Sequence, residues 1–191
     1  MQRKQWAFVA AAIVIGLLGV GAWQVYASRA VEPVSMAPSS MMTPSAGITT
    51  YSNYDQPGLA QADVGAKIYG DWCITCHGDR GQGLTDAWRA TWDPEHQDCW
   101  QSKCHSLNHP PGGFQLPRHV PAIIGPTTLS EFKTADDLHQ FISHKMPFQD
   151  PGVLDADAYW ALTAYLLRQN GLVPTGAQVT SDSAGSIAIQ R

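Results

Sequence analysis

A Cys-x-x-Cys-His motif at residues 73–77 constrains the fold of this chain more than any other feature of its sequence. The pattern is typical of covalent haem c attachment, in which both thiols bond to the porphyrin and the histidine binds the iron. A disulfide oxidoreductase uses two cysteines at this spacing, but it needs no following histidine and usually has a βαβ context, which is lacking here. A structural zinc site would need a second pair at matching spacing. The motif therefore predicts one haem c, held by Cys73 and Cys76, with His77 as an iron ligand.

The composition of the 191 residues limits the classes of fold and partner. Twelve Lys and Arg residues against sixteen Asp and Glu residues give a net charge of −4. This charge argues against a nucleic-acid partner, because phosphate recognition needs a basic face. A hydrophobic content of 44% is too high for a disordered chain and sufficient for a modest core. We therefore expect one globular domain with appended segments.

An apolar run lies near the N-terminus. Residues 6–23 carry no charged side chain, and as a helix they would be about 27 Å long, close to the ~30 Å hydrocarbon core of a membrane. Arg3 and Lys4 precede the run, so the positive-inside rule places the N-terminus in the cytoplasm. We predict a single-pass transmembrane anchor within residues 1–30 that holds the haem domain on the periplasmic side of a bacterial cytoplasmic membrane. The alternative is a cleaved signal peptide.

Composition also divides the rest of the chain. Residues 31–57 are rich in Pro and Ser and show neither a helical nor a strand period, which predicts a linker. Residues 174–191 are small and polar, which predicts a C-terminal tail without a core of its own. The globular domain is therefore predicted to span residues 58–173, with an insertion at about 90–118.

Three helices are predicted in this domain, and no segment alternates convincingly as a strand. The first spans residues 61–72. The second begins after Thr134, which can form a capping box with Asp137. The third runs from Asp155 to Asn170, which precedes a glycine suited to a left-handed stop. The fold class is therefore all-α.

These features together resemble the class I cytochrome c family. Gly65 and Tyr69 precede the motif as the family's glycine and aromatic residue do on its first helix, and Tyr165 is similar to the aromatic residue of its last helix. Pro121 resembles the proline whose carbonyl accepts a hydrogen bond from the proximal histidine, here His77, and so orients it. The resemblance implies the class I cytochrome c fold, three or more helices around haem c, and one-electron transfer at the iron.

The sixth iron ligand is predicted from the methionines. Of the five in the chain, only Met146 lies within residues 58–173, in a Met-Pro sequence that resembles the family's ligand loop. His139 and His144 are the alternatives. His/Met ligation fills the coordination of the iron and raises its reduction potential, which favours electron transfer over oxygen or peroxide chemistry.

A second cysteine pair, Cys99 and Cys104, lies in the insertion and is followed by His105. The pair either forms a disulfide, as is natural in an exported protein, or attaches a second haem through a four-residue spacer, as in some multihaem cytochromes. From the sequence we favour the disulfide, because two haems would leave little core in a domain of this size. The histidines available as a distal ligand to a second haem are His96, His109 and His119.

The anchor, linker and insertion together predict a membrane-anchored electron-transfer subunit of a respiratory or photosynthetic complex, with no catalytic residue of its own. More narrowly, the chain is similar to the monohaem cytochrome c subunit of alternative complex III, a bacterial quinol-oxidising assembly. That resemblance implies a multihaem cytochrome subunit as electron donor and a soluble cytochrome or copper protein as acceptor. The alternatives are a free-standing tethered electron shuttle and a dihaem cytochrome with peroxidase-like activity.

Overall fold

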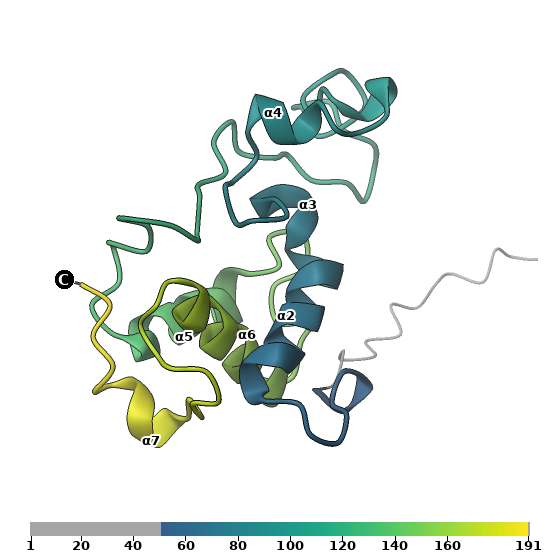
Figure 1. The fold of residues 1–191 in the computed structure, drawn as a ribbon. Coiled ribbons are helices and arrows are strands. Elements are labelled where there is room, and N and C mark those ends of the chain that lie inside the picture. The colour runs from purple at the N-terminus through teal and green to yellow at the C-terminus, as the bar shows by residue number, and fades with distance from the viewer. Residues whose placement is uncertain (1–50, 191) are drawn as a thin grey trace, which may run out of the picture. The chain divides into compact units, whose positions relative to one another are not determined.

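Two helices that cross at close range form the centre of the fold (Figure 1). The computed structural model describes residues 51–190, in which α2 spans Gln61–Trp72 and α6 spans Ala156–Gln169. The third long helix, α5, spans Ala135–Lys145 and packs against α6. No β-strand occurs in this part of the chain, as the prediction of an all-α fold requires.

Five short helices complete the described part of the chain. They are η1 (Tyr51–Asn53), α3 (Ile74–His77), α4 (Asp86–Arg89), η2 (Pro94–His96) and α7 (Ser181–Ala184). The predicted anchor in residues 1–30 lies outside the described residues, as does most of the predicted linker. Between residues 51 and 190, no helix combines the length and the apolar character that crossing a membrane requires.

The crossing of α2 and α6 depends on a glycine. A side chain at Gly65 would collide with the backbone carbonyl of Ala161 on α6, so only glycine permits this approach. One turn further along α2, the ring of Tyr69 packs against that of Tyr165, with ring centroids 5.2 Å apart. The helix pairing implied by the family resemblance is therefore present.

The predicted helix starts are confirmed by their caps. The Thr134 hydroxyl accepts a hydrogen bond from the backbone N–H of Asp137, and the Asp137 carboxylate accepts one from the N–H of Thr134, which completes the capping box of α5. The Asp155 carboxylate accepts the N–H of Ala158 at the start of α6. Both caps satisfy backbone donors that would otherwise have no partner.

An ion pair joins the start of α2 to the end of α6. An Arg168 nitrogen lies 2.6 Å from an Asp63 carboxylate oxygen, and this guanidinium holds the pKa of Asp63 below its usual value. A carboxyl group with a lowered folded-state pKa stabilises the fold above its unfolded-state pKa, and this contribution disappears as the pH falls through the folded-state value.

We therefore expect Asp63→Asn to make the stability of the domain less dependent on pH in the acid range. The melting temperature of the wild type should fall more steeply than that of the variant as the pH decreases from about pH 5 through the lowered pKa of Asp63. Thermal unfolding followed by far-UV circular dichroism across this range measures the difference. Parallel curves for the two proteins would show that the pair contributes nothing.

The segment predicted as a polar C-terminal tail without a core of its own, residues 174–191, contributes to the core of the domain. Val179, Ala184 and Ile189 are buried in the same hydrophobic core as the long helices. The buried Gln61 amide on α2 donates to the Val179 carbonyl at 2.9 Å and accepts the Val179 N–H at 2.8 Å. The folded domain therefore extends from residue 51 to residue 190 instead of ending at residue 173.

Candidate functional site

The Cys-x-x-Cys-His motif and Met146 line one open pocket, which holds about 1120 Å³ of empty space. The pocket lies between the motif, the end of α5 and the inner face of α6, so segments distant in sequence meet there. The apolar side chains on its wall are Tyr69, Trp72, Leu116, Val120, Ile123, Leu129, Phe132, Leu138, Phe141, Ile142, Phe148, Leu162 and Leu166. Such a wall suits a flat, largely apolar ring system and excludes water from its faces.

Cys73 lies between α2 and α3, and Cys76 lies within α3. Both are free thiols, and the His77 N–H donates to the Cys73 carbonyl at 2.9 Å. Burial raises the pKa of Cys73 to about 12, and burial also raises the pKa of Cys76. A disulfide oxidoreductase needs a cysteine with a lowered pKa, so these thiols are suited to attachment of a group and not to thiol exchange.

The side chain of His77 is oriented by Pro121, as the sequence predicts. His77 Nδ1 lies 3.3 Å from the Pro121 carbonyl oxygen, which can only accept a hydrogen bond, so Nδ1 carries the proton. This leaves Nε2 as the nitrogen available to a metal, and a carbonyl partner of this kind raises its basicity. Burial lowers the pKa of His77, which favours the neutral, ligating form of the ring.

The Pro121 segment is held from two sides. On one side, the Gly81 carbonyl accepts the N–H groups of Ile123 and Ile124, and a side chain at Gly83 would meet the Pro121 carbonyl carbon at 2.8 Å. The glycines after the motif therefore allow its loop to pack directly on this segment.

On the other side, Asn170 at the end of α6 holds the same segment. Its amide nitrogen donates to the Ile123 carbonyl at 3.0 Å, and its amide oxygen accepts the Gly125 N–H at 3.0 Å. From the sequence, Asn170 is predicted only to end the last helix, because its hydrogen-bond partners Ile123 and Gly125 lie about 45 residues away in the chain. Its second role is to fix the backbone that orients His77.

Met146 lies directly after the last residue of α5, and its backbone is held by α6. The Tyr159 hydroxyl donates to the Met146 carbonyl at 2.7 Å and accepts the Gly152 N–H at 3.0 Å. One side chain therefore ties both ends of the loop that carries Met146. Nothing in the sequence marks Tyr159 for this role.

We expect Tyr159→Phe to loosen the Met146 loop. Losing these hydrogen bonds should destabilise the closed loop by about 1 kcal/mol, and cyanide should bind the ferric protein about five-fold faster because Met146 dissociates more often. Stopped-flow mixing with cyanide measures this rate. Tyr54→Phe is the matched control, since it removes a tyrosine hydroxyl that accepts a hydrogen bond from Trp72 instead. Equal rates in the two variants would contradict the role of Tyr159.

The two alternative ligands lie elsewhere. His139 stacks on Trp160 with ring centroids 3.5 Å apart, and His144 Nδ1 lies 2.7 Å from the Gln140 carbonyl oxygen within α5. Neither lines the pocket that contains the motif. The arrangement therefore favours Met146 over these two histidines as the second iron ligand.

The second cysteine pair lies apart from this pocket. Cys99, Cys104 and His105 line another open pocket, built by the insertion, and both thiols are free. His105 Nδ1 lies 3.2 Å from the Phe114 carbonyl oxygen. Of the three candidate distal ligands, His96 lines this second pocket and His119 lines the first, whereas His109 lines neither.

The residues of the first pocket fit a covalently bound haem c. They supply two half-buried thiols at the attachment spacing, an imidazole with a fixed tautomer, a thioether and a largely apolar wall. Imidazole and thioether are the donor pair typical of electron-transfer haem proteins.

The family described as "Cytochrome C oxidase, cbb3-type, subunit III" matches residues 60–166. No curated protein sequence matches the chain. Among solved structures, the chain is similar to one in "Crystal Structure of the Sulfane Dehydrogenase SoxCD from Paracoccus pantotrophus", with 22% identity and a TM-score of 0.41. That match covers 72% of this chain and 62% of the other, so it spans less than two thirds of the known protein.

Proposed function

This chain belongs to the family described as "Cytochrome C oxidase, cbb3-type, subunit III", and on that premise we propose that it is a membrane-anchored electron-transfer subunit of a quinol-oxidising complex. Membership in a cytochrome c family implies a covalently bound haem c and electron transfer. When bound, the haem supplies one-electron exchange between ferric and ferrous iron. The residues that line the pocket would hold this haem and set its properties.

The motif residues hold the group and fix its electronic character. Cys73 and Cys76 would attach the haem, and His77, whose proton is kept on Nδ1 by Pro121, would supply a ligand nitrogen. Met146 lines the same pocket and would supply a thioether ligand. Such a ligand pair would leave no open site for oxygen or peroxide and would raise the reduction potential.

The pocket wall excludes water but leaves an apolar rim. Wall residues such as Leu138 and Leu162 are buried, whereas Phe141 and Phe148 are 42% and 43% exposed. An exposed aromatic rim beside the cofactor is suited to brief contact with an electron-transfer partner, because it brings the partner close without a large desolvation of charges.

The membrane and partner parts of the proposal are supported by the sequence. The apolar run within residues 1–30 would hold the domain at the periplasmic face of the cytoplasmic membrane. A multihaem cytochrome subunit of alternative complex III would supply electrons, and a soluble cytochrome or copper protein would remove them. The observation that carries the electron-transfer proposal is the meeting of the motif, Pro121 and Met146 at one apolar pocket.

Native electrophoresis of membranes extracted in mild detergent tests the subunit proposal. A haem-stained band that contains this chain together with a multihaem cytochrome is the expected result. Migration as a lone species near the chain's own 20.7 kDa would contradict membership in a complex and would favour a free-standing tethered shuttle.

A further inference from the structure

The insertion builds a second open pocket that, like the first, is lined by two cysteines and a histidine, here Cys99, Cys104 and His105. Its wall combines apolar side chains with charged ones, which are Asp93, Glu95, Asp98 and Lys103. Against the preference for a disulfide drawn from the sequence, we propose that it binds a second haem c, attached through Cys99 and Cys104 with His105 as an axial ligand. This proposal goes beyond the proposed function. The two share only the requirement that haem c becomes attached to the chain.

The local geometry at His105 matches that at His77. The His105 N–H donates to the carbonyl of the first cysteine of its pair, Cys99, at 2.9 Å, as the His77 N–H does to Cys73 at 2.9 Å. His105 Nδ1 lies 3.2 Å from the Phe114 carbonyl oxygen, and His77 Nδ1 lies 3.3 Å from that of Pro121. In both cases the carbonyl keeps the proton on Nδ1 and leaves Nε2 for a metal. A disulfide would need neither the oriented imidazole nor the pocket.

Contacts of Trp100, which does not itself line the second pocket, hold the insertion together without a Cys99–Cys104 bond. The guanidinium groups of Arg89 and Arg118 lie 5.1 and 5.2 Å from the Trp100 ring, and the indole N–H donates to the Leu116 carbonyl at 3.1 Å. Arg89 also donates to the Gln97 carbonyl. These interactions fix the insertion around a tryptophan, so both thiols remain available for attachment.

Attachment needs no oxidant or reductant. Each cysteine S–H adds across one vinyl double bond of the haem: the S–H bond breaks, the sulfur bonds to the inner vinyl carbon, and the hydrogen goes to the outer carbon. Two such additions consume two thiols, so one chain can carry a haem at this pair only if the pair forms no disulfide.

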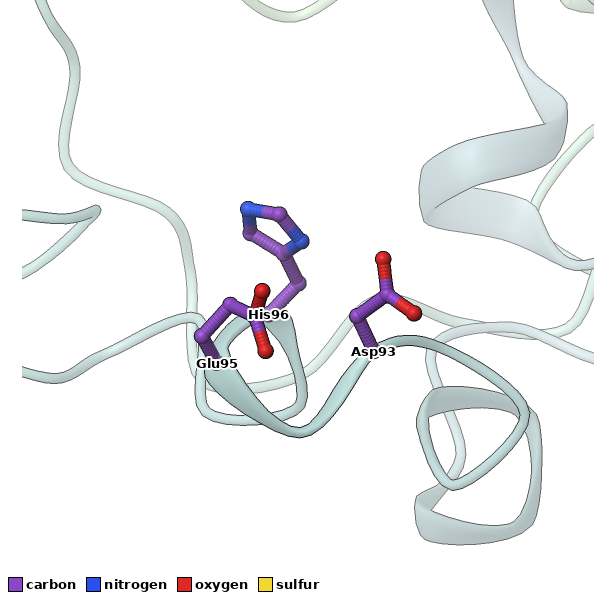
Figure 2. Close-up of side chains that lie close together, drawn as sticks. All are labelled: Asp93, Glu95 and His96. Carbon is purple, nitrogen blue, oxygen red and sulfur yellow. The ribbon is translucent and has the colours of Figure 1, made fainter.

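His96 is assigned as the sixth ligand of this second haem. It is the other histidine that lines this pocket, and Figure 2 shows its ring projecting from η2 beside the side chains of Asp93 and Glu95. The ligand atoms of these three exposed residues lie within 4.8 Å of one another. Two neighbouring carboxylates would favour the ferric state by their negative charge, so this haem should have a lower potential than the His/Met haem.

Aromatic contacts connect the two pockets. The rings of His105 and Phe114 lie 4.3 Å apart, and those of Phe114 and Phe148 lie 5.9 Å apart. Phe148 lines the first pocket, while Cys76 and Leu116 line both. Two haems held this way would be neighbours. The insertion would then provide a second place at which electrons enter or leave the domain.

Tryptic mapping of the full-length protein, purified with its haem, tests the attachment. Trypsin cleaves after Arg89, Lys103 and Arg118, so Cys99 and Cys104 fall on separate peptides, residues 90–103 and 104–118. We expect these two peptides to remain joined in one species that carries a haem mass and absorbs in the Soret region. The same pair joined without haem and separated by a reductant would establish the disulfide and overturn the proposal. Two separate peptides with free thiols would also overturn it.

The same digest distinguishes this proposal from the proposed function. Cys73 and Cys76 both lie on the peptide of residues 68–80, whose haem tests the first site independently. The intact wild type should carry two haem masses, and the Cys99→Ser/Cys104→Ser double variant should carry one. Equal haem content in the two proteins would contradict the second site.

Carbon monoxide binding tests the assignment of His96. The ferrous wild type should bind none, whereas His96→Ala should bind one equivalent per chain at the second haem. His109→Ala is the matched control, because His109 lies in the same insertion but does not line the pocket. The absence of carbon monoxide binding by His96→Ala would overturn the assignment.

Discussion

Met146→Ala is expected to abolish the sulfur-to-iron charge-transfer band of the ferric protein and to lower its reduction potential. Met146 is the thioether that lines the same pocket as the Pro121-oriented His77. Removing it deletes the ligand that raises the potential and opens one axial position. The ferrous variant should therefore bind about one equivalent of carbon monoxide per first-site haem, where the wild type binds none. Optical spectroscopy of both oxidation states measures these changes.

His144→Ala is the matched control for this change. His144 lies two residues before Met146 and was an alternative ligand from the sequence, but it is exposed and lies outside the pocket. This variant should keep the charge-transfer band and the wild-type potential. Loss of the band in His144→Ala, or its persistence in Met146→Ala, would show that Met146 is not the ligand.

Gly65→Ala should have the largest effect on stability. The added methyl group would meet the Ala161 carbonyl carbon at 2.6 Å and the Tyr165 Cβ at 2.8 Å, and neither atom can move without displacing α6. Overpacking of this kind costs up to about 3 kcal/mol, which corresponds to a fall in melting temperature of about 10 °C for a domain of this size. Denaturant titration and thermal unfolding measure the loss.

Gly70→Ala is the matched control on the same helix. A side chain there would have no atom within 4 Å, and the position is exposed. This change should stabilise the domain by about 0.5–1 kcal/mol, because alanine loses less conformational entropy in a helix than glycine. A similar change of stability in both variants would show that the close crossing at Gly65 is not what makes Gly65→Ala destabilising.

The features predicted correctly from the sequence are those set by short-range chemistry. The starts of α5 and α6 follow from Thr134 and Asp155, whose side chains cap a helix within three residues. The pairing of Gly65, Tyr69 and Tyr165 follows from a resemblance whose residues recur at fixed spacing. Because α5 packs against α6, Met146 at the end of α5 lines the same pocket as the motif.

The features that were missed depend on contacts between residues far apart in the chain. Residues 174–190 are polar in composition, yet Val179 is buried because the Gln61 amide, 118 residues earlier, satisfies its backbone groups. Asn170 and Tyr159 act through hydrogen bonds to loops whose positions no local pattern specifies. The second pocket was likewise not predicted, because its lining brings together residues from Thr75 to Leu116 that no local pattern connects.

The central claim is that the first site holds a six-coordinate His77/Met146 haem that transfers single electrons. Spectropotentiometric titration of the purified protein, with the sulfur-to-iron band as the signal, tests it most directly. The band should be present in the ferric protein, disappear on reduction and return on reoxidation in one reversible one-electron transition. A ferric protein without this band, or a band that is not restored on reoxidation, would contradict the account.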